Sequence, residues 1–235
     1  MRAVRGFTLL ELLVATAVVS GLALGAFALV RDARDAFVVD TERADMHQRL
    51  RVGAVTLVQS LLDASAVRPY RADGAAADPP GTFKDDTITA VGASPVTFWL
   101  KSDDRAGTCQ LMSYAGGVAA DVPVVDNVVR LTFEYFGDPL PSIEPPGRQL
   151  VPLPAAQLTD GPWRPDEFAA TRWDADLARV RAVRITLRVQ AAAAALRGPA
   201  NALFARAGTA IDPARWVPDL EAQFQVAPRN LNLGR

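Results

Sequence analysis

The chain begins with an apolar run that a single acidic residue interrupts. Between Phe7 and Val30 there are 24 residues, and Glu11 is the one charged side chain among them. Because a helix rises about 1.5 Å per residue, a run of this length can cross the roughly 30 Å hydrocarbon core of a bilayer. We therefore predict a transmembrane helix over residues 7–30.

After Val30 charged residues alternate with apolar ones, and no proline occurs before Pro69. Apolar residues recur here at spacings of three and four, which is typical of an amphipathic helix with one buried face. We predict one continuous helix from Thr8 to Ala66, whose second half, residues 31–66, packs on a sheet. The predicted apolar stripe comprises Met46, Leu50, Ala54, Leu57 and Leu61, with Val55, Val58 and Leu62 beside it.

The remaining residues, 67–235, contain segments in which apolar and polar residues alternate. This alternation is typical of half-buried antiparallel strands. The clearest segments are 129–135, 183–189 and 220–226, and shorter ones are 96–100 and 110–114. The predicted fold is α+β: a long N-terminal helix packed on an antiparallel β-sheet in one β-rich globular domain.

Two segments have a composition typical of loops. Residues 71–86 are rich in Ala, Asp, Gly and Pro, and residues 139–165 contain eight prolines. We predict an extended loop without regular structure for 139–165. Trp163 and Trp173 either cap the core or contact a partner, and the five-alanine tract at 191–195 is a strand end or a short helical turn.

The distribution of charged residues predicts a membrane topology and does not predict a nucleic-acid site. The formal net charge is −1, and Arg2 and Arg5 precede the apolar run. The positive-inside tendency then places the N-terminus in the cytoplasm and the residues after Val30 outside the inner membrane. Basic residues recur at Arg179, Arg181, Arg184 and Arg188. The last three follow a strand pattern and are interpreted as a solvated sheet face rather than a DNA track.

The residues needed for common catalytic and metal sites are scarce. His47 is the single histidine and Cys109 the single cysteine, so a His-based catalytic triad, a zinc site and an intramolecular disulfide are not expected. Cys109 is predicted to be a buried, unreactive thiol. The acidic pairs 85–86 and 103–104 could offer oxygen ligands to calcium and are interpreted as charged loop tips. We expect no enzyme activity, no metal site and no cofactor.

Glu11 needs a cationic partner if the apolar run lies in a bilayer. A central acid costs about 2.5–3.5 kcal/mol in a membrane helix, and no basic residue lies between Phe7 and Val30. A cation at this depth would exist if residues 1–6 were removed, because Phe7 would then carry a free amine. The amine of a neighbouring copy could meet Glu11.

A short basic leader followed by Gly6, Phe7, Thr8, Leu9 and Glu11 closely resembles the type IV prepilin signature. The resemblance implies cleavage between Gly6 and Phe7 by a prepilin peptidase and N-methylation of the new Phe7 amine. It also implies that Glu11 pairs with the amine of an adjacent subunit during assembly. An ordinary signal anchor and a secretory signal peptide are the alternatives, and the latter would show an apolar region of about 7–15 residues before a small-x-small cleavage site.

The order of helix and strands is similar to that of the W-type minor pilins of type IV pili and the J-type minor pseudopilins of type II secretion. Two departures from many major pilins favour a minor subunit: Cys109 has no pairing cysteine, and Ala28 replaces a helix-kinking proline. Ala17, Gly21 and Gly25 recur at four-residue spacing, which allows helices to approach closely.

The predicted function is therefore that of a structural minor pilin or pseudopilin in the bacterial inner membrane and then in a filament or at its tip. The resemblance implies as partners the peptidase and methyltransferase, other pilin or pseudopilin subunits, an inner-membrane assembly platform and, before assembly, membrane lipid. A tip adhesin or DNA-uptake module and a membrane-anchored enzyme are the alternatives. The choice between a type IV pilus and type II secretion stays open.

Overall fold

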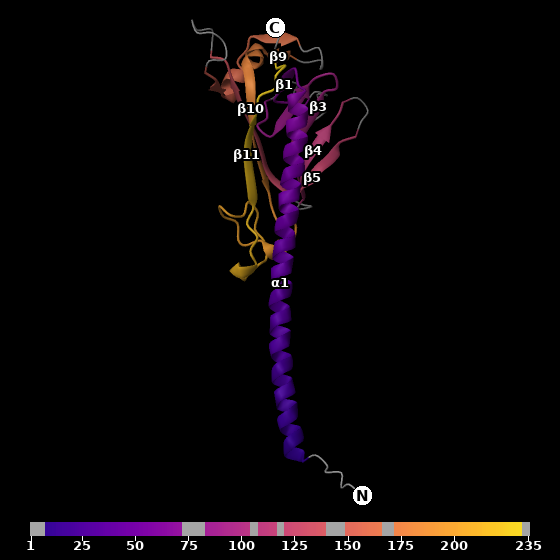
Figure 1. Cartoon of the computed structure of the whole chain (residues 1–235). Helices are drawn as coiled ribbons and strands as arrows, with labels where there is room; N and C mark the ends of the chain where they lie inside the picture. The colour runs from indigo at the N-terminus through magenta and orange to yellow at the C-terminus, as the bar shows by residue number, and fades with distance from the viewer. Residues whose placement is uncertain are drawn as a thin grey trace.

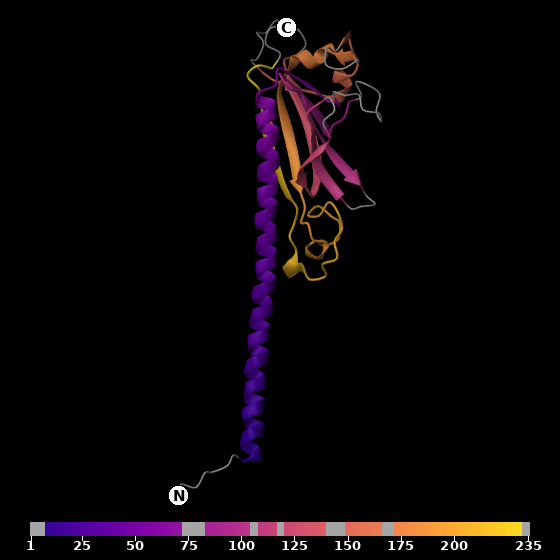
Figure 2. The ribbon, with the colours of Figure 1, turned by 90° about the vertical axis from the view of Figure 1, so that its right-hand side faces the viewer.

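The structure, a computed structural model, describes residues 8–71, 83–103, 108–116, 120–139, 149–165 and 172–231. Its dominant element is the 54-residue helix α1 (Leu9–Leu62), about 80 Å long at the usual rise. The first half of α1 projects alone, and the second half lies along a β-rich domain (Figures 1 and 2). This arrangement confirms the predicted α+β class, with one long N-terminal helix packed on antiparallel sheets.

Helix α1 ends at Leu62, before the end predicted at Ala66. The Ala64 N–H donates to the Leu61 carbonyl, and the Ser65 N–H donates to the Val91 carbonyl at 2.7 Å. Residues 66–68 then form a strand. The predicted boundary was wrong because pairing with a distant strand takes up backbone groups that the helix would otherwise have used.

Two antiparallel sheets and a short ribbon form the domain. The first sheet has the strand order β1-β2-β3-β4-β5, the second has the order β11-β10-β6-β7, and the ribbon pairs β8 with β9. The strands of the first sheet are β1 (Ala66–Arg68), β2 (Thr87–Val91), β3 (Val96–Asp103), β4 (Thr108–Tyr114) and β5 (Val122–Asp126). The others are β6 (Val128–Gly137), β7 (Val151–Leu153), β8 (Trp163–Pro165), β9 (Arg172–Asp174), β10 (Val180–Val189) and β11 (Leu220–Val226).

The three clearest alternating segments of the sequence, 129–135, 183–189 and 220–226, lie in the second sheet. Strand β10 is its centre, with Ile185 opposite Phe133 of β6 on one side and Phe224 of β11 on the other. Aligned apolar positions of this kind put one face of the sheet in the core. All five segments predicted from alternation lie within strands, and the structure extends several of them at their ends.

The apolar stripe of α1 lies against both sheets, where it contacts β5, β10 and β11. Met46, Leu57 and Leu61 are fully buried, as predicted. Gly53 is buried too, and a Cβ atom there would come within 2.8 Å of Leu187 Cδ2. The helix therefore approaches the second sheet most closely at a residue that the predicted stripe did not include.

The proline-rich segment is more regular than predicted. Residues 140–148 lie outside the described residues, but β7 pairs with β6 and β8 pairs with β9. Pro152 lies in β7, at the edge of its sheet, where a missing N–H costs no ladder bond. The prediction of an extended loop was wrong for this described part, because strand pairing compensates for the low propensity of its residues.

The two tryptophans have different surroundings. Trp173 is buried in the main core, whereas Trp163 is 45% exposed on β8. The five-alanine tract ends in a short 3₁₀ turn, Ala194–Leu196. The other 3₁₀ turns are Ala155–Leu158, Ala175–Arg179 and η4 (Pro213–Arg215).

Candidate functional site

The first turn of α1 is closed by a reciprocal pair of hydrogen bonds. The Glu11 N–H donates to Thr8 Oγ1 at 3.2 Å, and the Thr8 N–H donates to Glu11 Oε2 at 3.3 Å. Thr8 is the N-cap, and the pair forms a capping box. Such a box satisfies two N–H groups that lack a partner within the helix.

The capping box gives Glu11 a local role that the sequence reasoning missed. The signal was present, because Thr-x-x-Glu before an apolar run is the sequence signature of this cap. The box uses Oε2, and the Glu11 side chain is exposed. Among the described residues, no ion pair includes Glu11. Gly6 and Phe7, the predicted cleavage and methylation residues, lie outside the part of the chain that the structure describes, as do Arg2 and Arg5.

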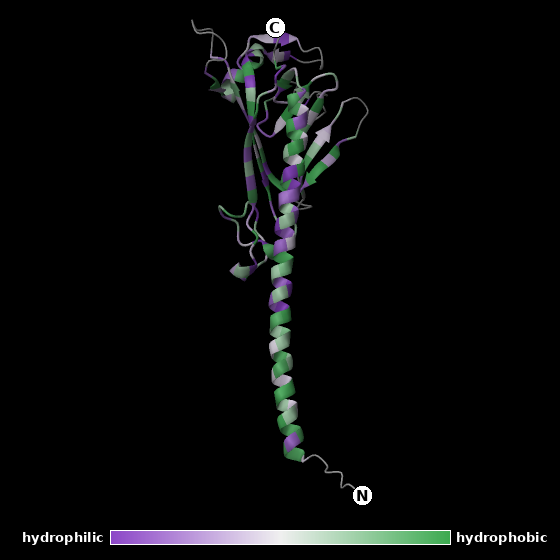
Figure 3. Cartoon of the chain, viewed as in Figure 1, coloured by the Kyte–Doolittle hydropathy of each residue, from purple (hydrophilic) through white to green (hydrophobic). Residues whose placement is uncertain are grey.

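The projecting half of α1 is apolar and has no protein neighbour. Its most apolar 18-residue window has a mean hydropathy of 2.3 and is 0% buried, so by length and composition this helix could cross a membrane. In Figure 3 the ribbon of this half is coloured mostly as hydrophobic, whereas the half beside the domain has a mixed colouring. Gly21 and Gly25 of the predicted small-residue stripe would meet nothing within 4 Å if they carried a Cβ atom. This surface is therefore available to lipid or to other helices.

One cluster of carboxylates joins residues that the sequence reasoning did not connect. Ligand atoms of Asp160, Asp174 and Asp176 lie within 4.8 Å of one another. Asp174 already accepts hydrogen bonds from the backbone N–H groups of Gly161 and Asp176, at 2.7 and 2.8 Å. Asp176 pairs with Arg179 at 3.3 Å. These contacts account for the cluster as a capped turn.

The acidic pairs considered for calcium take no part in that cluster. Asp86 accepts a hydrogen bond from the Thr87 hydroxyl, and its partial burial raises the pKa of the carboxyl group. The Asp85 carbonyl accepts from the Phe133 N–H at 2.7 Å. Asp103 is at the end of β3, and Asp104 lies outside the described residues.

The single cysteine and the single histidine lie in different elements and differ in solvent exposure. Cys109 is buried in β4, which confirms its predicted burial, and His47 is exposed on α1. No site that combines a nucleophile with a base is formed by these two residues.

The arginines of β10 are paired rather than simply solvated. Arg181 pairs with Asp138 at 2.8 Å, Arg184 with Glu134 at 3.2 Å and Arg188 with Asp219 at 3.0 Å. All three are half-buried. The interpretation as a solvated face was therefore incomplete, because carboxylates from neighbouring segments neutralise each charge.

Two apolar grooves open on the domain. One, of about 620 Å³, lies between α1 and β11 and is lined by exposed Val55 and Leu62 together with Phe224. The other, of about 730 Å³, lies beside β6 and β7. It is lined by Tyr135, whose hydroxyl is buried without a hydrogen-bond partner. Burial, and secondarily the charge of Asp85, raise the pKa of that hydroxyl.

Comparisons with known proteins identify the N-terminal segment. Residues 1–27 match the family described as the prokaryotic N-terminal methylation motif. Among solved structures, a type IV-like pilin from Thermus thermophilus is similar, with 13% sequence identity, a TM-score of 0.30 and coverage of 80% of this chain and 98% of that chain. No curated protein sequence matches the chain.

Proposed function

We propose that this chain, a type IV prepilin-like protein, is a structural minor pilin or pseudopilin that is processed in the inner membrane and assembled into a filament or at its tip. One observation carries the proposal. The methylation motif over residues 1–27 includes most of the exposed apolar half of α1, and the same helix continues into a folded β-rich domain. A subunit of this form has one part for lipid or a helical filament core and one part for display. The role is structural and requires no catalysis by the chain.

Processing would remove residues 1–6 and leave the rest of the helix start intact. Cleavage between Gly6 and Phe7 precedes both residues of the capping box, so the Thr8–Glu11 hydrogen bonds can persist in the mature chain. The new Phe7 amine, N-methylated, would add a positive charge beside the helix start. Since the box uses Oε2, Oε1 of Glu11 can accept the amine of a neighbouring subunit.

Assembly would use the exposed half of α1. Residues 7–30 span the membrane, and residues 31–62 form the amphipathic part of the helix. Residues 67–235 then lie on the periplasmic side, with the N-terminus in the cytoplasm. Ala17, Gly21 and Gly25 would allow the helices of adjacent subunits to approach closely. The partners are the prepilin peptidase and methyltransferase, the assembly platform, and other pilin or pseudopilin subunits.

The groove beside β6 and β7 favours a second function for the same subunit, a binding module at the filament tip. The register places β7 at the end of the second sheet that lies far from the projecting half of α1. The groove is mainly apolar, so it suits an apolar ligand better than DNA. Filaments that assemble normally but lose attachment in an Ala155→Asp variant, which changes an exposed residue of the groove, would support this role.

The mass of the mature N-terminal peptide tests the proposal. The protein is produced in cells that contain their own prepilin peptidase, and the N-terminal peptide is analysed by mass spectrometry. We expect a chain that begins at N-methylated Phe7. An intact Met1, or cleavage near residue 30, would instead identify a signal anchor or a secretory signal peptide.

A further inference from the structure

The segment between β10 and β11, residues 190–219, forms a lobe at the end of the domain nearest the projecting half of α1 (Figures 1 and 2). Three contacts tie this lobe to the helix, the first of which is the hydrogen bond from Arg49 Nη1 to the Gln190 carbonyl at 3.4 Å. The Ala192 N–H donates to Glu42 Oε1 at 2.7 Å, and Arg215 pairs with Asp35 at 3.7 Å. The lobe therefore lies alongside α1 just beyond its apolar half.

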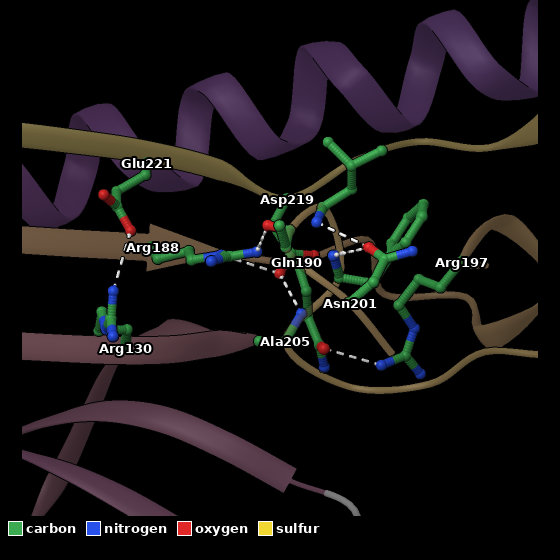
Figure 4. A network of polar contacts seen from close by, with 11 residues as sticks. Arg130, Arg188, Gln190, Arg197, Asn201, Ala205, Asp219 and Glu221 are labelled. Atoms are coloured by element: carbon green, nitrogen blue, oxygen red, sulfur yellow. Dashed lines mark hydrogen bonds and ion pairs between the residues drawn. The ribbon is translucent and has the colours of Figure 1, made fainter. Parts of the chain in front are cut away.

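A buried polar network holds the lobe on the second sheet (Figure 4). The Asp219 side chain is 0% exposed and accepts hydrogen bonds from Arg188 at 3.0 Å and from the Ala205 N–H at 2.7 Å. Arg197 donates to Gln190 Oε1 at 2.8 Å. Because Asp219 Oδ2 and Gln190 Oε1 accept these hydrogen bonds inside the protein, the lobe cannot move along the helix without breaking several hydrogen bonds.

The rise of the helix per residue gives the height of the lobe above the end of the apolar run. At about 1.5 Å per residue, Asp35 lies about 7 Å beyond Val30. The headgroup layer adds roughly 5–7 Å to each side of a hydrocarbon core. If residues 7–30 span a bilayer, η4, whose Arg215 pairs with Asp35, lies at the outer edge of the lipid headgroup layer.

The tip of the lobe, residues 209–216, exposes an apolar side chain at this level. Ile211 is 95% exposed, the largest exposed fraction of any bulky apolar residue in the described part of the chain. Phe37, close to Asp35 on α1, is 71% exposed. A single exposed apolar residue needs no explanation by itself, but Ile211 lies two residues before η4, in the part of the domain that comes nearest to the headgroup layer.

We propose that the tip of the lobe rests on the bilayer that holds α1, with Ile211 inserted among the phospholipid headgroups. This inference depends on the proposed function, since it requires residues 7–30 to span the membrane. The contact would fix the height and tilt of the domain before the subunit leaves the membrane for the filament.

The charges at this level indicate that the contact is apolar rather than electrostatic. Arg31, Arg34 and Arg215 are balanced by three acids of the same region, namely Asp32, Asp35 and Asp212. Without a net positive charge, attraction to anionic lipid is weak. We therefore expect the same insertion in phosphatidylcholine vesicles and in vesicles that also contain phosphatidylglycerol.

Fluorescence quenching in vesicles tests the inference on the full chain. Cys109 is replaced by alanine, and single cysteines that carry an environment-sensitive dye are placed at positions 211, 22 and 122. Ile211 and Val122 are both exposed, so neither label disturbs the core, and Val122 lies at the far end of the first sheet. Circular dichroism checks that each variant is folded.

With a nitroxide quencher near the headgroups, the dye at position 211 is expected to lose most of its emission and the dye at position 122 none. A quencher deep in the acyl chains should quench the dye at position 22. Quenching at 22 with none at 211 would overturn the lobe contact and leave the membrane span intact. Absence of quenching at position 22 would overturn both the membrane span and the lobe contact. Quenching at position 211 that occurs only with phosphatidylglycerol would overturn the apolar nature of the contact.

Discussion

Glu11 illustrates how one side chain can serve two purposes. In the isolated chain it completes a capping box with Thr8, and in the proposed filament its charge meets the Phe7 amine of a neighbour. The two roles make different demands on the residue. A capping box accepts Glu or Gln at this position, whereas pairing with an amine requires the negative charge.

Two substitutions of Glu11 separate these roles. Glu11→Gln keeps the hydrogen bonds of the cap and removes the charge, and Glu11→Ala removes both. If the carboxylate pairs with an amine, both variants are cleaved normally and both fail to enter filaments, as measured by immunoblots of membrane and sheared-filament fractions. Normal assembly of Glu11→Gln would show that the cap alone is needed.

Substitution of Asp219 tests whether a buried ion pair contributes more to folding stability than an exposed one. Replacing it with asparagine removes the charge that faces Arg188 within the lobe network, and breaking a buried pair costs about 3–5 kcal/mol. Glu221→Gln is the matched control, because Glu221 and its partner Arg130 are both largely exposed and such pairs contribute about 0–1 kcal/mol. Urea unfolding followed by tryptophan fluorescence measures the free energy of unfolding of both variants. Equal decreases in the two variants would contradict a stabilising role for the buried network.

At the scale of elements, the packing of α1 on the two sheets determines which of its leucines matter. Leu57 is 0% exposed in the core, whereas Leu62 on the same helix is 45% exposed. Both belong to the apolar positions that the sequence predicted on this helix. Their five-residue spacing places them about 140° apart around the helix, and the position of the sheets decides which is covered.

Leucine-to-alanine substitutions test this difference. Leu57→Ala is expected to lower the free energy of unfolding by about 2–5 kcal/mol through a core cavity. Leu62→Ala is expected to change it by less than about 1 kcal/mol, because much of that side chain already meets water. Urea titrations of both variants give the comparison. A large loss at Leu62 would mean that the groove beside β11 is closed in solution.

At the scale of the whole molecule, the two halves of α1 differ in whether they contact the β-rich domain. The apolar window of α1 is not buried against the domain, while α1 from Val39 onward contributes to the core. The membrane half and the globular domain therefore have separate sources of stability.

Truncation tests this division. A fragment of residues 31–235 is expected to be soluble and to unfold cooperatively, because it keeps Val39, Met46 and the helix contacts of the lobe. A fragment of residues 47–235 loses Val39, Met46 and the lobe contacts of Asp35 and Glu42. Its melting temperature should be about 5–15 °C below that of the longer fragment. Thermal unfolding by circular dichroism measures both, and a non-cooperative transition for the longer fragment would mean that the projecting half supports the fold.

The sequence alone determined what depends on local pattern. The apolar run, the helical spacing and the alternating segments specified α1 and the main strands, because periodicity follows directly from the geometry of helices and strands. The same linear pattern carried the prepilin signature, since a peptidase recognises a short segment of chain rather than a surface.

Only the tertiary structure decided what depends on contacts between distant residues. Pairing with β2 moved the end of α1 to Leu62, and pairing with β6 ordered part of the proline-rich segment. The approach of Gly53 to Leu187 and the lobe network around Asp219 join residues far apart in the chain. Such contacts arise from the closure of long loops, whose energetics no local pattern encodes, so the lobe beside the membrane helix could be found only in three dimensions.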